Sequence, residues 1–480
     1  MTELLIFIIY LGGLFAIAIW NWLKQKSDSD FILGGRSLNF WLTALSAHAS
    51  DMSSWLFLAY PSVIFLFGPF QAWAGIGLTV MMYLNWQFIA PRIRTISEQT
   101  DSLTLNAYFE NRFADSSGSI RTVSALMSLV FFIIYISSGL VGLGLLVEAL
   151  LGYHYFWGIS IGLLIVVAYV FLGGYTAVAW IDLIQGFFLL GVIIFIPAYL
   201  IPKLGGMGPI VQAMHENKLS TSLFPDFSAR TLLEIFFIAF GWGLGYFGQP
   251  HIITKFMGIK KVGDINKAKI VGISWQILAL GGATFLGLIG IYLFQKGLDN
   301  PERVVLDIVQ QTLPGVVTGL VLCAILAATT NVMAAQILVV ASSLAEDFYK
   351  RLFRKTASSK ELLWISRFGV IFTGLLAFII AFFKVSTIYQ LVLYAWTGLG
   401  CSFGPLLLIS LYSKSVNKYG AFYGIFIGGI TAAFWYAFSP KIMGLAIPAM
   451  IPGFLLSSLA ILLATLITRK KEISNENTAY

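Results

Sequence analysis

The sequence predicts an all-α integral membrane protein. Of its 480 residues, 58% are hydrophobic and 11% are charged, and the mean hydropathy is +0.85. Soluble domains carry about 25% charged residues, so this chain has too few charges to cover a soluble surface. Apolar stretches long enough to cross about 30 Å of hydrocarbon as a helix follow one another along the chain. We therefore expect residues 1–480 to form one membrane-embedded domain.

The first apolar stretch, 4–23, contains no charged residue. Glu3 precedes it and Lys24 and Lys26 follow it. A cleaved signal peptide begins instead with a basic segment. We therefore interpret this stretch as the first membrane span.

The same criterion predicts thirteen membrane helices. They are expected near 4–23, 41–67, 70–90, 122–150, 155–174, 183–202, 231–253, 270–295, 315–346, 362–383, 388–412, 420–438 and 445–468. The connections after odd-numbered helices hold 23 of the 30 Lys and Arg residues, and the other side holds 7. Basic connections lie in the cytoplasm. The N-terminus is therefore expected outside and the C-terminus inside.

The second helix contains a polar stretch, Ser46-Ala47-His48-Ala49-Ser50-Asp51-Met52-Ser53-Ser54-Trp55. A charge at mid-bilayer costs about 2.5–3.5 kcal/mol even on lenient scales. Small polar side chains also compete for backbone hydrogen bonds. An unwound turn at this depth is tolerated where it lines a cavity or is buried in protein. We interpret the stretch as a solute or ion site; a polar seam between packed helices is the alternative.

A second break is predicted in the seventh helix, between 240 and 251. Four glycines and a proline in this stretch oppose a regular helix. Trp242, Tyr246 and Pro250 are spaced by four residues, so a helical path places them on one face. Such a face suits stacking against a small, partly apolar solute, although aromatic residues also anchor helices at the membrane interface. The glycine spacing from Gly243 to Gly248 matches a dinucleotide-binding motif. We do not interpret it as a nucleotide site, because no strand precedes it.

The two broken helices are the second and the seventh of the series. Five helices separate them, so the second unit starts with the opposite orientation. Paired interruptions in inverted halves are the strongest sequence indication of a transporter's binding site. We expect inverted repeats at 40–202 and 231–412, preceded by 1–39 and followed by 413–480. The core would then consist of two inverted repeats of five helices each.

Polar residues also lie within the ninth helix, where Thr329, Thr330, Asn331 and Gln336 occur in an apolar span. Their oxygens are of the type that hard cations prefer. Interhelical hydrogen bonds are an equal alternative.

Other classes of protein fit poorly. No metal-ligand, nucleophile–base or phosphate-loop arrangement indicates an enzyme, and the two cysteines, Cys323 and Cys401, lie in apolar spans. The basic residues are spread over separate connections, which argues against nucleic-acid binding. We expect no resident cofactor and no obligate protein partner, only a small solute and membrane lipid.

Four stretches resemble the sodium/solute symporter family, and its proline branch in particular. They are Phe31–Leu38 with Ser46–Ser53, the run Gly241–Ile252, Ala341–Asp347, and Tyr394-Ala395-Trp396. The resemblance covers essentially the whole chain. It implies a LeuT-like fold and import of L-proline with a cation, sodium, across a bacterial inner membrane by alternating access. Another small organic solute is the alternative.

The resemblance also implies the site residues. For the solute they are Ser53, Ser54, Tyr135, Trp242, Tyr246 and Pro250. For the cation they are Ala49, Met52 and Ala328, with Asn331 and Val332 at the positions of the family's Ser-Thr pair and Asp51 close by.

Three positions depart from the family pattern. Ser54 and His48 stand where glycine is usual, and Val332 offers no side-chain oxygen. His48 is three residues from Asp51 and so lies on nearly the same helical face. A histidine–carboxylate pair is a plausible proton carrier. Proton coupling, or a weak dependence on sodium, is therefore kept as the alternative to sodium coupling.

Overall fold

The computed structural model describes residues 2–24, 28–438 and 440–478, and it consists almost entirely of helices. The first ten are α1 Thr2–Lys24, α2 Asp28–Leu33, α3 Phe40–Ala49, α4 Tyr60–Phe67, α5 Trp73–Leu84, α6 Ala90–Gln99, α7 Leu105–Arg112, α8 Ser119–Leu151, α9 Tyr155–Lys203 and α10 Met207–Glu216. The others are α11 Ala229–Gly243, α12 Pro250–Gly258, α13 Ile265–Leu293, α14 Val304–Thr312, α15 Gly315–Ser343, α16 Ser359–Phe382, α17 Ile388–Tyr412, α18 Lys418–Phe438 and α19 Met450–Thr478. Two short strands, β1 Lys441–Ile442 and β2 Leu445–Ala446, form an antiparallel pair.

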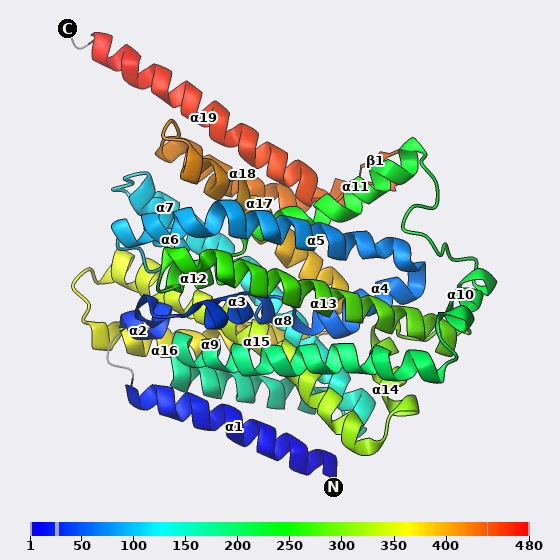
Figure 1. Ribbon diagram of the computed structural model, residues 1–480. Coiled ribbons are helices and arrows are strands. Elements are labelled where there is room, and N and C mark those ends of the chain that lie inside the picture. The colour runs from blue at the N-terminus through cyan, green and yellow to red at the C-terminus, as the bar shows by residue number, and fades with distance from the viewer. Residues whose placement is uncertain (1, 25–27, 439, 479–480) are drawn as a thin grey trace.

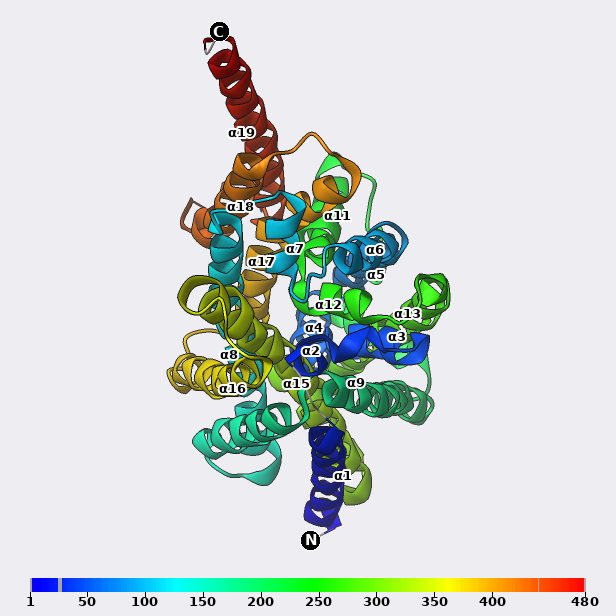
Figure 2. The same cartoon turned by 90° about the vertical axis from the view of Figure 1, so that its left-hand side faces the viewer.

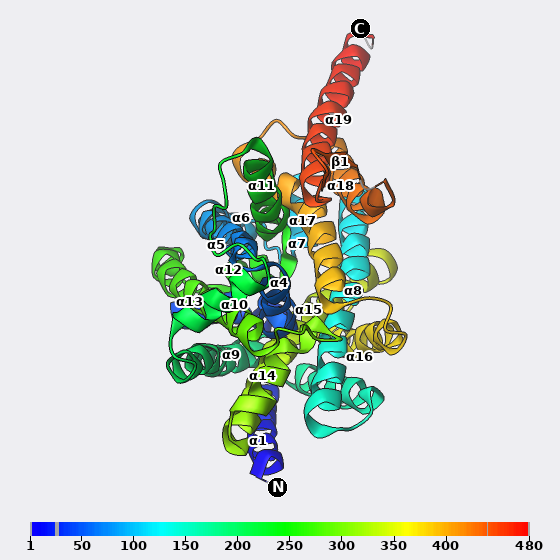
Figure 3. The same cartoon turned by 90° about the vertical axis from the view of Figure 1, so that its right-hand side faces the viewer.

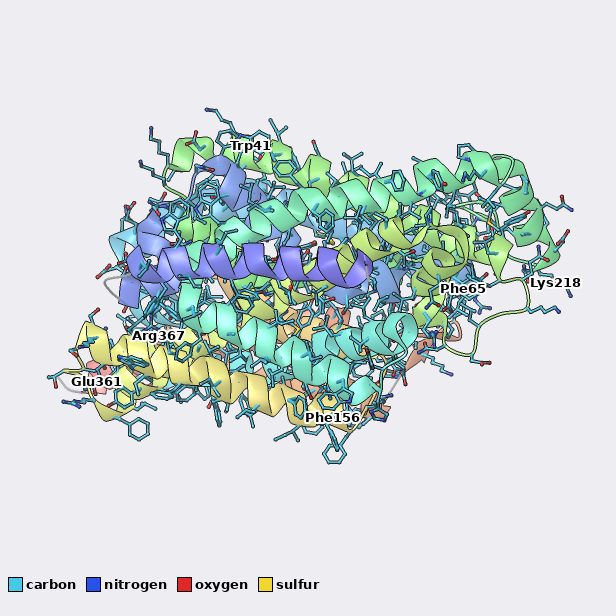
Figure 4. The ribbon with its side chains drawn as sticks, turned by 90° about the horizontal axis from the view of Figure 1, so that it is seen from below. Trp41, Phe65, Phe156, Lys218, Glu361 and Arg367 are labelled. Carbon is cyan, nitrogen blue, oxygen red and sulfur yellow. The ribbon has the colours of Figure 1, made fainter. Side chains whose placement is uncertain are left out.

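The long helices lie roughly along one direction, so the bundle has two ends (Figure 1). We call the end that carries α2 and α7 the basic end; Figure 2 looks onto it. The opposite end carries α10, α14 and the strand pair, and it faces the viewer in Figure 3. Seen from below, Glu361 marks the basic end and Lys218 the opposite end (Figure 4). The chain starts at the opposite end and finishes at the basic end, as an odd number of crossings requires.

Nine helical segments of the described chain are long and apolar enough to span a membrane. Helix α9 is 49 residues long and contains the non-helical residue Gly174, at φ 58° and ψ −160°. At 1.5 Å per residue a single helix of this length would be far longer than the bilayer is thick, so α9 supplies two spans. Helix α1 lies between its two parts (Figure 4). The total of thirteen spans stays a prediction. The first and second spans qualify only as shorter apolar helices, Tyr10–Leu23 and Trp55–Phe67, and a π-helical turn at Asn85–Ile89 interrupts the third.

The break predicted in the second span is present. Helix α3 ends at Ala49. A π-helical turn covers Trp55–Ala59 and leads into α4, which starts at Tyr60. Ser53, between them, has φ +28°, a left-handed conformation that non-glycine residues rarely adopt. The chain therefore crosses the middle of the bundle as two half-helices.

The break predicted in the seventh span is also present. Helix α11 ends at Gly243, a 3₁₀ turn covers Leu244–Gly248, and Gln249 is extended at φ −91° and ψ 102°. Helix α12 starts at Pro250, whose missing N–H is harmless at a first helical position. This half-helix continues to Gly258, five residues beyond the predicted end of the span.

Other boundaries differ from the sequence expectation. Helices α7, α10 and α14 lie in connections for which no helix was predicted. The last span starts at Met450 rather than near 445, because the turn at Met443 and Gly444, both at positive φ, folds the preceding residues into the strand pair. Short apolar pieces flanked by turn residues carry too weak a periodic signal to be placed from sequence.

Small residues set the closest helix contacts. A Cβ added to Gly77 of α5 would lie 2.3 Å from the carbonyl oxygen of Ala239 in α11, and one on Gly243 would lie 2.7 Å from the oxygen of Gly77. In lipid, where apolar burial does not drive helices together, such backbone approach is the main source of packing energy. The α5–α11 contact thus holds the second broken helix against the rest of the bundle.

Gly77→Ala is expected to destabilise the protein by about 1–3 kcal/mol, because the new methyl group meets rigid backbone. The matched control is Gly281→Ala in α13, where an added Cβ meets nothing within 4 Å. The apparent melting temperature of the purified protein should be lower for Gly77→Ala than for the control. Equal melting temperatures would contradict the close α5–α11 contact.

Candidate functional site

Asp51 lies in the unwound turn between α3 and α4. It is 6% exposed, and within the described part of the chain it forms no ion pair. The hydroxyl of Tyr246, from the 3₁₀ turn of the other broken span, donates a hydrogen bond to its Oδ2. This contact joins the two interruptions to each other.

The local sequence explains the unwound turn. The hydroxyl of Ser50 donates to the carbonyl of Ser46, one turn back, at 2.5 Å. The hydroxyl of Ser53 accepts from the backbone N–H of Trp55 at 3.1 Å. Serine hydroxyl groups thus bond to the backbone on both sides of the point where α3 stops.

A cavity, called the solute cavity here, opens beside this carboxylate. Its lining consists of Asp51, Met52, Trp55, Leu78, Tyr135, Trp242, Val392 and Trp396. The rings of Trp55 and Trp242 lie 5.1 Å apart, and the indole N–H of Trp396 donates to the carbonyl of Trp242 at 2.7 Å. The remaining space admits little more than water-sized particles. In this conformation the walls therefore leave no room for a molecule much larger than water.

On the side of the opposite end, Tyr389 at the start of α17 covers Trp242. Its hydroxyl accepts from the indole N–H of Trp242 at 3.3 Å, and the two rings meet edge-on at 5.4 Å. Both oxygens of Glu302 accept backbone N–H groups at the start of α17, from Ile388 and Tyr389, at 3.1 and 2.8 Å. The solute cavity is thus closed by aromatic packing and by an anchored helix end.

The residues predicted for the solute do not all lie in this cavity. Tyr135 and Trp242 line it, and Tyr246 reaches it through Asp51. Ser53 and Ser54 are adjacent in the turn, and the hydroxyl of Ser54 is buried with no hydrogen-bond partner in the described chain. Pro250 lines a different cavity nearer the basic end.

The residues predicted for the cation lie on α3, its following turn and α15, and these two helices contact each other. Ala49, Ala328 and Val332 are at most 1% exposed. Both polar atoms of the Asn331 amide are buried and lack a partner among the described residues. The amide oxygen of Asn331 is therefore free to serve as a ligand.

The neighbouring threonines are oriented into their own helix. The hydroxyls of Thr329 and Thr330 donate to the carbonyls of Ile325 and Leu326, each at 2.8 Å. A hydroxyl that donates in this way keeps its lone pairs. Neither threonine is thus excluded as an oxygen ligand.

Two tryptophans, Trp86 and Trp275, flank His48. Its Nε2 accepts from the indole N–H of Trp86 at 3.0 Å, and its ring lies between those of Trp86 and Trp275. An imidazole nitrogen that accepts a hydrogen bond carries no proton, so His48 is neutral here. No hydrogen bond or ion pair between His48 and the Asp51 carboxylate occurs in the described chain.

A buried ion pair went unnoticed in the sequence. The ammonium of Lys255 in α12 lies 3.2 Å from Oδ2 of Asp182 in α9, and both side chains are at most 2% exposed. The hydroxyl of Ser46 donates to the same oxygen at 2.5 Å. The predicted end of the seventh span near 253 would leave Lys255 in the following connection. That boundary is wrong, because α12 continues to Gly258. A lone Asp182 between two apolar spans was the available signal.

Gln276 of α13 is a further residue that sequence reasoning missed. Its amide N–H donates to the hydroxyl of Tyr246 at 3.2 Å, and its Oε1 has no partner in the described chain. It therefore orients the hydroxyl that holds Asp51. A glutamine inside an apolar helix was its only sequence signal.

Comparison with known proteins identifies one family and similar proteins within it. The family model described as "Sodium:solute symporter family" matches residues 31–428. The high-affinity proline transporter PutP of Bacillus subtilis (strain 168) is 39% identical over 459 residues, which cover 94% of this chain and 95% of that protein. The sodium/proline symporter of Escherichia coli (strain K12) is 36% identical over 476 residues, covering 97% and 93%.

Solved structures have the same fold at low sequence identity. A substrate-bound, outward-open Na⁺-coupled sialic acid symporter superposes with a TM-score of 0.81 at 18% identity, covering 97% of this chain and 98% of the other. MhsT in complex with L-phenylalanine gives a TM-score of 0.55 at 15% identity, covering 88% and 97%. The expected LeuT-like fold is thereby confirmed.

Tyr246→Phe removes only the hydroxyl that holds Asp51 and is expected to lower stability by about 1.5–3 kcal/mol, the range for hydrogen bonds to charged groups. Tyr60→Phe is the matched control, since the Tyr60 hydroxyl bonds a neutral partner, Thr284, at 3.0 Å. The apparent melting temperature should fall further for Tyr246→Phe. A larger fall for Tyr60→Phe would contradict the assigned contact.

Proposed function

Because the chain belongs to the sodium:solute symporter family, we propose that it is a secondary active symporter that imports L-proline together with a cation. The observation that carries the proposal is Asp51, a buried carboxylate without a cationic partner in the described chain, placed where two broken helices meet. A buried carboxylate of this kind attracts a cation. The adjoining aromatic cavity supplies a surface for a small ring.

The solute's ring would lie against the aromatic walls formed by Trp55, Tyr135, Trp242 and Trp396. Ser53 or Ser54 would bind its carboxylate, and the unpartnered hydroxyl of Ser54 supports this role. Aromatic faces recognise a pyrrolidine ring mainly by apolar contact and by attraction to its positively charged nitrogen. Another small amino acid with an apolar side chain is the alternative solute.

The coupling cation would be sodium, held by the backbone carbonyls of Ala49, Met52 and Ala328. The unpartnered amide of Asn331 supports an added ligand from α15, whereas Val332 supplies none. The neutral, aromatic surroundings of His48 speak against a proton carried by this residue. Asp51 itself stays the candidate carrier if protons replace sodium.

Cation and solute would drive alternating access by binding more tightly to one conformation than to another. The cation would tie α3 to α15 and favour the state open to the outside; the solute would permit closure. The repeats 40–202 and 231–412 would move as the two inverted halves within a single transport domain. Residues 1–39 and 413–480 would flank them.

We place the chain in a bacterial inner membrane with its N-terminus outside and its C-terminus in the cytoplasm. The concentration of Lys and Arg in connections of the basic end supports this orientation. Membrane lipid would be the only other partner.

Asp51→Asn is expected to lower L-proline uptake by about tenfold or more, equivalent to about 1.4 kcal/mol of lost cation binding. The measurement is uptake into proteoliposomes at equal protein content, with sodium and proton gradients imposed separately. Asp226→Asn, in an exposed connection, is the control and should transport normally. Normal uptake and normal cation dependence in Asp51→Asn would rule out this role.

Val332→Thr restores a side-chain oxygen on α15 and is expected to lower the sodium concentration for half-maximal uptake by about tenfold, or ~1.4 kcal/mol. Val340→Thr, also buried on α15, is the matched control. If sodium drives accumulation at fixed pH and Val332→Thr leaves the sodium dependence unchanged, the argument for an incomplete sodium site is wrong.

A further inference from the structure

A second cavity, called the inner cavity, lies nearer the basic end than the solute cavity. Helix α12 supplies Pro250, His251, Thr254 and Lys255, and other helices supply Asn106 and Ser128. The lining also includes Ile32 of α2, and Figure 2 shows α12 between α7 and α2 near the centre of the bundle at this end. The inner cavity thus lies between the solute cavity and the solvent at the basic end.

Buried polar groups face this cavity without partners. Both ring nitrogens of His251, the hydroxyl of Ser128 and Oδ1 of Asn106 have no hydrogen-bond partner among the described residues. These three side chains are at most 3% exposed. Each such group costs about 1–3 kcal/mol when left unsatisfied. Four such atoms around one space indicate that the space receives a polar ligand.

Hydrogen bonds to other residues fix the orientation of the Asn106 amide. Its amide N–H groups donate to Asp347 and to Ser343, both at 2.8 Å. Asp347 is in turn paired with Arg121 at 2.6 Å. With both amide hydrogens engaged, Oδ1 of Asn106 is left as an acceptor for the ligand.

The two cavities are separated by one pair of rings. Tyr135 lines the solute cavity, and His251, which lines the inner cavity, meets its ring edge-on at 6.2 Å between centroids. Phe132 closes the other side of His251 at 5.6 Å. A solute that moves directly from the solute cavity into the inner cavity would therefore pass Tyr135 and His251.

The polar groups match an amino acid. The Lys255 ammonium has three N–H donors and hydrogen-bonds only to Asp182 within the described chain. The carboxylate of an amino acid can therefore accept hydrogen bonds from both Lys255 and His251. Asn106 and Ser128 provide acceptors for a positively charged nitrogen. Leu338 and Val339 add an apolar wall.

We propose that the inner cavity is a second binding station for the transported amino-acid zwitterion on its way to the basic end. The proposal rests on the proposed function and adds a site that is separate from the solute cavity. In this structure the inner cavity admits only water-sized particles. Occupation therefore requires α12 to move away from α8 and α15.

Ser128→Cys tests the proposal through thiol reactivity, since Cys323 and Cys401 are buried. In the purified full chain, L-proline should slow modification of Ser128→Cys by a small maleimide. Trp242→Ala should weaken binding of L-proline in the solute cavity. At high L-proline concentration, the protection of Ser128→Cys should nevertheless persist in this variant. The protection should disappear when Ser128→Cys is combined with His251→Leu in place of Trp242→Ala. Ser116→Cys, exposed at the basic end, is the control and should react at the same rate with and without L-proline.

Protection that is lost with Trp242→Ala, or that survives His251→Leu, would overturn the second station, because the effect would then be transmitted from the solute cavity. Ser342→Cys, which also lines the inner cavity, is a second reporter. Failure of both thiols to react would likewise overturn the proposal, since a station on the path must open to solvent. Normal L-proline uptake by the unmodified chain shows that any such failure concerns the inner cavity and not the proposed function.

Discussion

The hydrogen bond from Tyr246 to Asp51 is the contact on which the rest of the site depends. An interrupted helix inside a membrane exposes backbone groups that lipid cannot satisfy. Two interruptions that face each other solve this problem together, since each supplies polar groups to the other. Asn85 adds to the arrangement by donating to the carbonyl of Tyr246 at 3.0 Å. The aromatic walls of the solute cavity are built around this junction.

The sequence contained enough information to locate both interruptions. Asp51 with its serines, and the glycines before Pro250, are local signals, because they alter the backbone where they stand. The fold class follows from composition and from the length of the apolar spans. What could not be predicted depends on which helices meet. The Asp182–Lys255 pair joins residues 73 positions apart, and the position of Pro250 depends on how far the chain turns after Gln249.

Residue type alone was also a weak guide to role. His48 has the spacing for a pair with Asp51, yet Trp86 uses its available lone pair. His251 looked like part of a motif, yet its unpartnered nitrogens distinguish it from a packed histidine. In both cases the deciding fact is the neighbour in space.

The Asp182–Lys255 pair has a consequence for the electrical behaviour of the protein. Moving one elementary charge through the full membrane potential requires about 2.3 kcal/mol per 100 mV. A carboxylate and an ammonium 3.2 Å apart carry no net charge, so their joint displacement does almost no electrical work. A membrane voltage therefore does little work on this pair when the two side chains move together.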